Sequence, residues 1–182
     1  MPQIPSDFQE YIDSVPWEEL DDGYGNSAEI GTFGTLSLPT LLTNLCSDNE
    51  DERLDAINDG LWGRASHQGS VYSATAFAAK ALLILLKTRA VTDLSSGGMG
   101  SHPVSYDILR FLCHCWKFVQ NTANAKPYFP LFLNAARENI DTIISYQSDS
   151  DPEVCNAAQL LSSYIAAAPI KEKIRRSTKF PE

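Results

Sequence analysis

Basic residues are scarce in the first third of this chain. Residues 1–60 contain fourteen Asp and Glu but one Lys or Arg, a formal charge of −13, whereas residues 61–182 carry +4. A segment so poor in cations argues against a groove for nucleic acid, because phosphate backbones are bound by Lys and Arg. The excess of carboxylates predicts either a surface kept for solubility or one that attracts a basic partner, and the sequence leaves both open.

Long apolar runs, a secretory signal and a disulfide framework are also missing. The longest apolar stretch, residues 74–86, is interrupted by Lys80 and is too short to cross a bilayer. The first residues show neither the basic region nor the apolar run of a secretory signal. The four cysteines lie inside apolar helical patterns, where a thiol packs as a small hydrophobic group. We therefore expect a protein of the reducing cytoplasm with no membrane contact.

Motifs that would carry catalysis are absent as well. The sequence has no phosphate-binding loop, no dinucleotide-binding glycine pattern and no nucleophile-elbow motif. Cys113-His114-Cys115 looks like a set of metal ligands, but residues i and i+2 of a helix point about 200° apart and no second ligand pair exists. We expect no catalytic residue, no cofactor and no metal, and hence a protein that is not an enzyme.

One pattern occurs twice in the chain. Residues 47–61 and residues 148–161 each begin with an acidic turn and continue into an amphipathic helix. Such self-similarity is typical of helical solenoids, in which helix pairs bury their apolar faces by stacking on their neighbours. Helical periodicity predicts helices over 38–45, 50–64, 70–88, 104–120, 127–146 and 152–168, and no segment shows the alternation of a strand.

These elements predict an all-α fold, namely a HEAT-like α-solenoid of stacked antiparallel helix pairs. Residues 1–182 are expected to form a single domain. Within it, residues 1–35 are an irregular acidic segment rich in Pro, Gly and Asp, and residues 171–182 are a basic tail.

The segment 61–72 joins two expected helices through a polar turn, yet it contains Trp62, His67, Gln68 and Tyr72. A simple turn does not need such residues. One interpretation is packing, in which Trp62 and Tyr72 close the core and His67 caps the helix that ends near Gly63. The other interpretation is recognition of a partner by an exposed edge.

This segment resembles a group of bacterial HEAT-repeat proteins. The matching residues are Leu61-Trp62-Gly63, then His67-Gln68-Gly69-Ser70-Val71-Tyr72-Ser73-Ala74-Thr75, then Leu82-Leu83-Ile84-Leu85-Leu86. The resemblance covers residues 38–88, and residues 149–161 match only the general HEAT pattern. It implies an α-solenoid without catalytic residues. Proteins of this size and kind include immunity proteins, which bind and neutralise a toxin, and this inference is by association.

The sequence therefore predicts a protein-binding module, an immunity protein whose acidic surface neutralises a basic, nuclease-type toxin. The alternatives are a nucleic-acid-processing enzyme on a HEAT-like fold and a general intracellular scaffold. We expect a protein partner and no nucleic acid, and the oligomeric state is left open. The expected partner-binding residues are Asp21, Asp22, Tyr24, Glu50, Asp51, Glu52, Trp62, His67, Gln68 and Tyr72.

Overall fold

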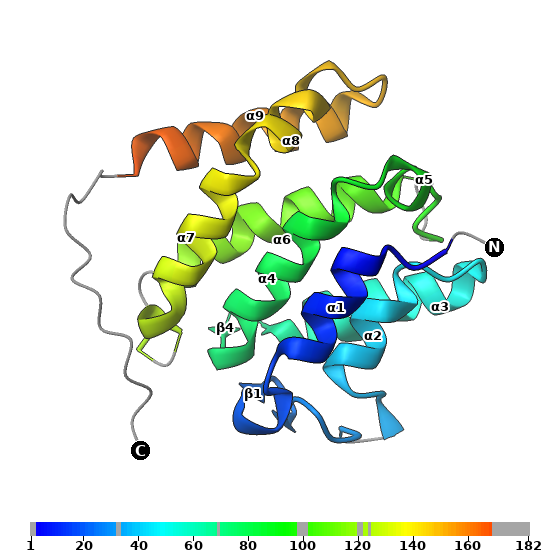
Figure 1. Cartoon of the computed structure of the whole chain (residues 1–182), viewed down its shortest axis with the longest axis vertical. Coiled ribbons are helices and arrows are strands. Elements are labelled where there is room, and N and C mark those ends of the chain that lie inside the picture. The colour runs from blue at the N-terminus through cyan, green and yellow to red at the C-terminus, as the bar shows by residue number, and fades with distance from the viewer. Residues whose placement is uncertain are drawn as a thin grey trace.

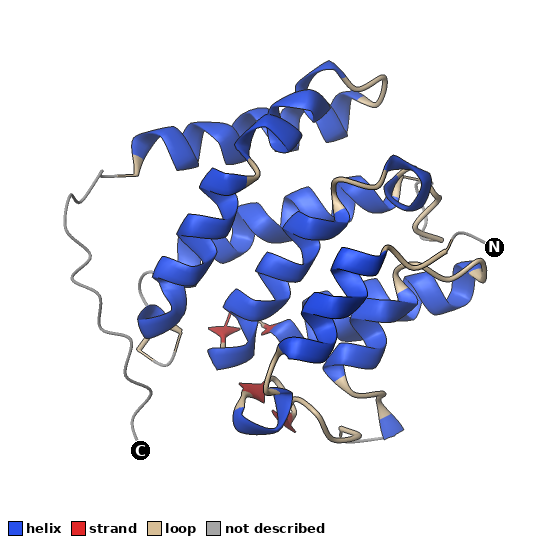
Figure 2. Ribbon diagram, in the orientation of Figure 1, coloured by secondary structure: helices blue, strands red, loops and turns tan. Residues whose placement is uncertain are grey.

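The computed structural model describes residues 3–31, 34–68, 70–97, 102–119, 122–123 and 125–168, and this part of the chain is mostly helical (Figure 2). The α-helices are α1 (Ser6–Ser14), α2 (Leu38–Asn44), α3 (Glu50–Asp55), α4 (Ser73–Leu85), α5 (Arg89–Thr92), α6 (Val104–Val119), α7 (Phe129–Glu138), α8 (Ile140–Ser145) and α9 (Pro152–Ala167). A π-helix, η3 (Ala56–Ala65), continues α3, and short 3₁₀ turns are η1 (Trp17–Glu19), η4 (Lys126–Tyr128) and η5 (Tyr146–Ser148). The expected all-helical class is confirmed, whereas the expected tail, residues 171–182, lies outside the described residues.

Helix α4 is the centre of the packing. It contacts α1, α6, α7 and η3, and α6 in turn lies against α9 (Figure 1). Its alanines, among them Ala74, Ala78 and Ala81, are completely buried and let these neighbours approach closely. The longest apolar stretch of the sequence, residues 74–86, thus corresponds to a helix that its neighbours cover on most sides.

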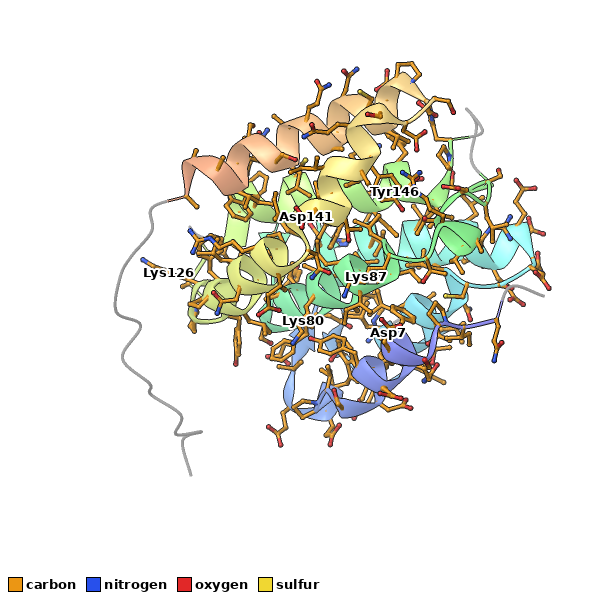
Figure 3. The ribbon with its side chains drawn as sticks, turned by 45° about the horizontal axis from the view of Figure 1, so that its top comes forward. Asp7, Lys80, Lys87, Lys126, Asp141 and Tyr146 are labelled. Atoms are coloured by element: carbon orange, nitrogen blue, oxygen red, sulfur yellow. The ribbon has the colours of Figure 1, made fainter. Side chains whose placement is uncertain are left out.

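The exposed strip of α4 carries two lysines. Figure 3 shows Lys80 and Lys87 along α4, with Asp7 of α1 on one side and Asp141 of α8 on the other. The Lys80 ammonium lies 4.9 Å from the centre of the Tyr11 ring, a cation–π contact that joins α1 to α4. This face of the molecule therefore presents charges of both signs.

Two small hairpins correct the expectation that no strands occur. Strands β1 (Asp21–Asp22) and β2 (Gly25–Asn26) form one antiparallel pair, and β3 (Ser66–His67) and β4 (Ser70–Val71) form the other. Each strand has two residues, which is too short for an alternating apolar pattern to be visible in the sequence. Residues 21–26, and residues 66–67 with 70–71, were expected to lie in irregular turns and instead form antiparallel pairs.

Two expected helices are interrupted. The helix expected over 50–64 changes at Ala56 from α to π geometry, where the backbone of Gly60 lies close to Leu41. A Cβ on Gly60 would lie 3.0 Å from the Leu41 Cβ. The helix expected over 127–146 breaks at Asn139, whose side-chain amide donates to the Ala135 carbonyl at 2.7 Å. Asparagine favours such local bonds over helix continuation.

The first copy of the repeated acidic turn caps α3 and holds a distant loop. The Asn49 side chain accepts from the Asp51 backbone N–H at 3.0 Å, which satisfies one orphan donor of the helix. Glu50 Oε1 accepts from the Ser95 hydroxyl at 2.7 Å, and Arg53 Nε donates to the Ser95 carbonyl at 2.7 Å.

The second copy repeats this arrangement at α9. Asp151 caps the helix by accepting from the Glu153 N–H at 2.8 Å, and its Oδ2 lies 3.2 Å from His102 Nδ1. Asp149 accepts from Arg89 Nη1 at 2.5 Å. Both copies therefore bind the connection between α4 and α6, one from each side, because Arg89, Ser95 and His102 all belong to it.

Within the described residues, no helix combines the length and the apolar character needed to cross a membrane.

The contact between Asp149 and Arg89 makes a pH-dependent prediction. Burial alone would raise the pKa of Asp149, but hydrogen bonds from Arg89 and from the Asp151 N–H outweigh it and lower the pKa below 3.8. Because the pKa of Asp149 is lower in the folded than in the unfolded protein, ionised Asp149 stabilises the fold at pH values above its unfolded-state pKa. This stabilisation is lost as the pH falls through the lower, folded-state pKa. Asp149→Asn should lower the free energy of unfolding by about 1 kcal/mol at neutral pH, or about 2–4 °C in melting temperature.

Urea titrations of both proteins at a series of pH values measure this difference. The gap between wild type and Asp149→Asn should close at pH values below 3.8. Asp93→Asn is the control, since Asp93 Oδ1 lies 3.3 Å from Arg89 Nη1 but the Asp93 side chain is 57% exposed. This substitution should lower the free energy of unfolding by less than Asp149→Asn does. A gap that is equal at neutral and acidic pH would contradict the ion pair.

Candidate protein-binding surface

Arg64 organises the acidic N-terminal segment from inside the molecule. Its side chain is completely buried at the end of η3. Its Nε donates to Asp22 Oδ2 at 2.6 Å, and its two terminal nitrogens donate to the carbonyls of Asn26 and Leu36, each at 2.9 Å. The planar guanidinium fork can reach acceptors in several directions at once, which an ammonium group on Lys cannot do in the same geometry. One side chain thus fixes both ends of the segment 22–36.

The backbone of the segment also approaches η3 closely. The Gly23 N–H donates to the Arg64 carbonyl at 2.7 Å, and a Cβ on Gly23 would lie 2.4 Å from the Gly63 carbonyl oxygen. Only glycine fits there. Tyr24, the next residue, lies with its ring centre 5.6 Å from that of His67. The tip of the first hairpin is therefore packed onto the second.

Asp22 is a correction to the expected site. It is 4% exposed and bonded to Arg64 and to the Tyr24 N–H, so a partner cannot reach it. Burial raises the pKa of Asp22, although the bonds from Tyr24 and Arg64 oppose this. Strand β1 explains the difference from Asp21, because successive residues of a strand point to opposite faces and Asp21 is exposed.

The remaining acids of residues 1–60 are all on the surface. Thirteen of the fourteen Asp and Glu are exposed, and Asp22 is the exception. The single cation of this segment, Arg53, is 5% exposed and donates to the carbonyls of Ser95 and Ser47 instead of facing carboxylates. The exposed acids are Asp7, Glu10, Asp13, Glu18, Glu19, Asp21, Glu29, Asp48, Glu50, Asp51, Glu52, Asp55 and Asp59, called here the acidic layer. No exposed Lys or Arg side chain of this segment neutralises the acidic layer.

The 61–72 segment divides into two environments. Trp62 lies on η3 and packs edge-on against Phe111 and His114 of α6 at 5.6 and 5.4 Å between ring centres. His67 does not cap a helix, because η3 runs to Ala65 and His67 belongs to β3. Gln68 is exposed at the tip of the hairpin.

Tyr72 is half-buried at the start of α4, where its backbone N–H helps to fix the helix N-terminus. Its N–H donates to Thr75 Oγ1 at 2.7 Å, and Thr75 Oγ1 donates to the Ala65 carbonyl at 2.6 Å. The structure therefore brings Tyr24, His67 and Gln68 together with Asp21 at the hairpins. Glu50, Asp51 and Glu52 lie elsewhere on α3, and Trp62 lies against α6.

Sequence reasoning missed the neighbours of Trp62. The Arg110 guanidinium carbon lies 5.2 Å from the centre of the Trp62 ring, and the His114 Nε2 lies 2.8 Å from the Ser66 hydroxyl. Burial, then the charges of Lys117 and Arg110, lower the pKa of His114, which favours a neutral ring at neutral pH. The spacing of Arg110, His114 and Phe118 at i, i+4 and i+8 was the available signal, because it places all three on one helix face.

A polar pocket of about 510 Å³ lies beside the second acidic turn. Arg89 lines it but is bonded to Asp93 and Asp149, and its guanidinium carbon lies 3.6 Å from the centre of the Tyr146 ring. Arg89 therefore joins α5 to η5 and to the turn that precedes α9. Within the described residues, no three His, Cys, Asp or Glu side chains are arranged to hold a metal ion.

The chain matches no protein-family model, no curated protein and no solved structure. The likeness to HEAT-repeat proteins therefore depends on the motif residues alone.

The Arg64–Asp22 pair makes a stability prediction with a built-in control. Asp22→Asn leaves the buried guanidinium without a charged partner and should cost about 3–5 kcal/mol of folding free energy. Asp21→Asn, one residue earlier on the exposed side of β1, should change it by less than about 0.5 kcal/mol. Urea denaturation measures both. Equal effects of the two substitutions would contradict a structural role for the pair.

The hairpin tip makes a second prediction. Gln68 has a φ of 49°, in the left-handed region that favours glycine. Gln68→Gly should keep or raise the melting temperature, whereas the β-branched Gln68→Val should lower stability by about 1–2 kcal/mol. Thermal melts of the two variants decide this. A glycine that destabilises as much as valine would show that the Gln68 side chain, not its backbone, supports the fold.

Proposed function

We propose that this chain is a non-catalytic protein-binding module and that its acidic layer binds a basic surface of a partner protein. The observation that carries the proposal is the charge arrangement: thirteen exposed carboxylates with the one cation of the segment turned inward. An excess of exposed carboxylates creates a field that accelerates encounter with a basic surface. Basic surfaces are typical of proteins that bind nucleic acid, so a nuclease-type toxin is the partner class that this field suits best.

The order of the acidic segment supports binding over solubility alone. A flexible acidic tail would keep a protein soluble equally well. Here Arg64 is buried to hold the segment 22–36, and Trp17 is 5% exposed with its indole N–H donating to the Ile12 carbonyl at 2.8 Å. Asp21 and its neighbours are therefore held in place before a partner arrives, which reduces the entropy lost on binding.

The helix contacts support a HEAT-like arrangement. Helix α4 packs on α6, and the following pair, α7–α8 with α9, packs on them so that α4 contacts α7 and α6 contacts α9. Like helices of successive pairs thus lie side by side, as in a solenoid. The preceding pair, α2 with α3–η3, reaches α4 and α6 through η3. We propose on this basis three stacked helix pairs.

Immunity is the role we propose for this module, since the motif resembles bacterial HEAT-repeat proteins, immunity is a role associated with proteins of this size and kind, and the acidic layer suits a basic toxin. The carboxylates would cover the groove in which a nuclease holds its substrate, so that inhibition needs no chemistry from this chain. A general scaffold would share the acidic layer and would differ in its partner alone.

The experiment mixes this chain with a basic, nuclease-type toxin domain as the probe. Association should slow as salt rises from about 50 to 500 mM, because screening shortens the reach of the field to a few ångströms. A variant with Asp21→Asn, Glu50→Gln, Asp51→Asn and Glu52→Gln should slow association by about tenfold at low salt and keep its fold. Asp22 is left unchanged because it is structural.

The matched control removes four acids outside the acidic layer: Asp93→Asn, Glu138→Gln, Asp141→Asn and Glu153→Gln. It makes the same change in net charge and should alter association by less than about twofold if location matters. Stopped-flow mixing measures both variants. Association that is indifferent to salt and equal for the two variants would mean that the acidic layer is only a solvated surface.

A further inference from the structure

Helix α6 exposes a narrow stripe whose composition differs from the rest of the helix. Ten of its residues are buried, whereas Arg110, Lys117 and Phe118 are exposed and His114 is half-buried. Phe118 is 38% exposed, and its ring centre lies 4.5 Å from that of His114. A large apolar ring at the surface of an otherwise well-buried helix is not needed to close the core.

The flanking helices extend this stripe into a surface. From η3, Trp62 lies under the Arg110 guanidinium and against His114. From α9, Tyr164 lies under the Lys117 ammonium at 5.8 Å, and Leu160, one turn earlier, is 42% exposed. We call these residues the α6 surface: Trp62, Arg110, His114, Phe118, Leu160 and Tyr164. Trp, Tyr and Arg are the residue types that dominate binding energy at protein interfaces.

Charge changes sign across this region. Arg110 and Lys117 of α6 supply cations, whereas Asp55 and Asp59, both exposed, lie on the α3–η3 helix that carries Trp62. A two-fold axis places the same patch of both copies face to face. A patch of one sign would repel itself there, but a patch with acids on one side and cations on the other attracts its own copy.

We propose that the α6 surface binds a second copy of this chain in a two-fold dimer. The aromatic residues meet at the centre, and the cations of α6 face Asp55 and Asp59 of the other copy. Asp55 and Asp59 also belong to the acidic layer, but the dimer needs neither a toxin nor Asp21 and Glu50–Glu52. Different substitutions therefore test the dimer and the proposed function.

Analytical ultracentrifugation of the full chain is the first test. The mass of the wild type should rise from 20.1 kDa toward twice that value between about 1 and 500 µM, the range of weak to moderate dimers. Arg110→Glu with Lys117→Glu should weaken dimerisation by about tenfold or more, because acids then face acids. Asp55→Lys with Asp59→Lys should also weaken dimerisation, because cations then face cations.

Mixing the two reversed variants is the decisive step. Each alone is repelled from its own copy, but an equimolar mixture pairs acids with cations on both sides of the axis and should restore the dimer mass. Lys80→Glu with Lys87→Glu is the control, since it makes the same charge change on α4 and should leave dimerisation within about twofold of wild type.

Two results would overturn the proposal. A wild type that sediments as a monomer over the whole concentration range excludes the dimer. The two charge-reversed variants could also stay monomeric when mixed, although circular dichroism shows that both are folded. That result excludes an interface in which α6 of one copy faces Asp55 and Asp59 of the other.

Discussion

The buried ion pair between Arg64 and Asp22 is the interaction on which the N-terminal part of the structure depends. Removing two charges from water is costly, and the cost is offset only where every polar atom finds a partner. Arg64 meets this condition with the Asp22 carboxylate and the carbonyls of Asn26 and Leu36. The same bonds tie the first hairpin and the entry to α2 onto η3. The positions of Asp21 and of the hairpin tip are therefore consequences of one buried guanidinium.

Local signals in the sequence predicted the helices well. The spacing of apolar residues located α6 and α9 almost to the residue. The failures involve contacts between residues far apart in sequence. Arg64 and Asp22 are 42 positions apart, so nothing near Arg64 distinguished it from a solvated residue of a polar turn. The close approach of Gly60 to Leu41 likewise joins residues far apart in sequence, and no local pattern encodes it.

The candidate surface divides in the same way. Glu50, Asp51 and Glu52 are exposed because they occupy the first turn of α3, a position that local reasoning identifies. Asp21 and Asp22 are adjacent and chemically identical, and only their alternation along β1 separates a surface acid from a buried one. Trp62 was recognised as unusual, but its contacts with Arg110 and His114 cross more than forty positions and needed the tertiary structure. Residue type therefore selected the candidate residues, and the tertiary structure decided which of them lie together.

The thirteen exposed carboxylates of the acidic layer have a cost, because like charges repel and weaken the compact state. Apolar anchors beneath the acidic layer offset that repulsion: Phe8 is completely buried, and Trp17 and Leu20 are 5% and 4% exposed. Burying such side chains stabilises the fold by about 1.5–3 kcal/mol each, more than exposed charges lose at a distance through water. The α1–η1 segment can therefore remain highly charged and ordered at once. Charge without anchors would give a disordered tail, and anchors without charge would give an ordinary surface helix, so their combination is what a preorganised electrostatic surface requires.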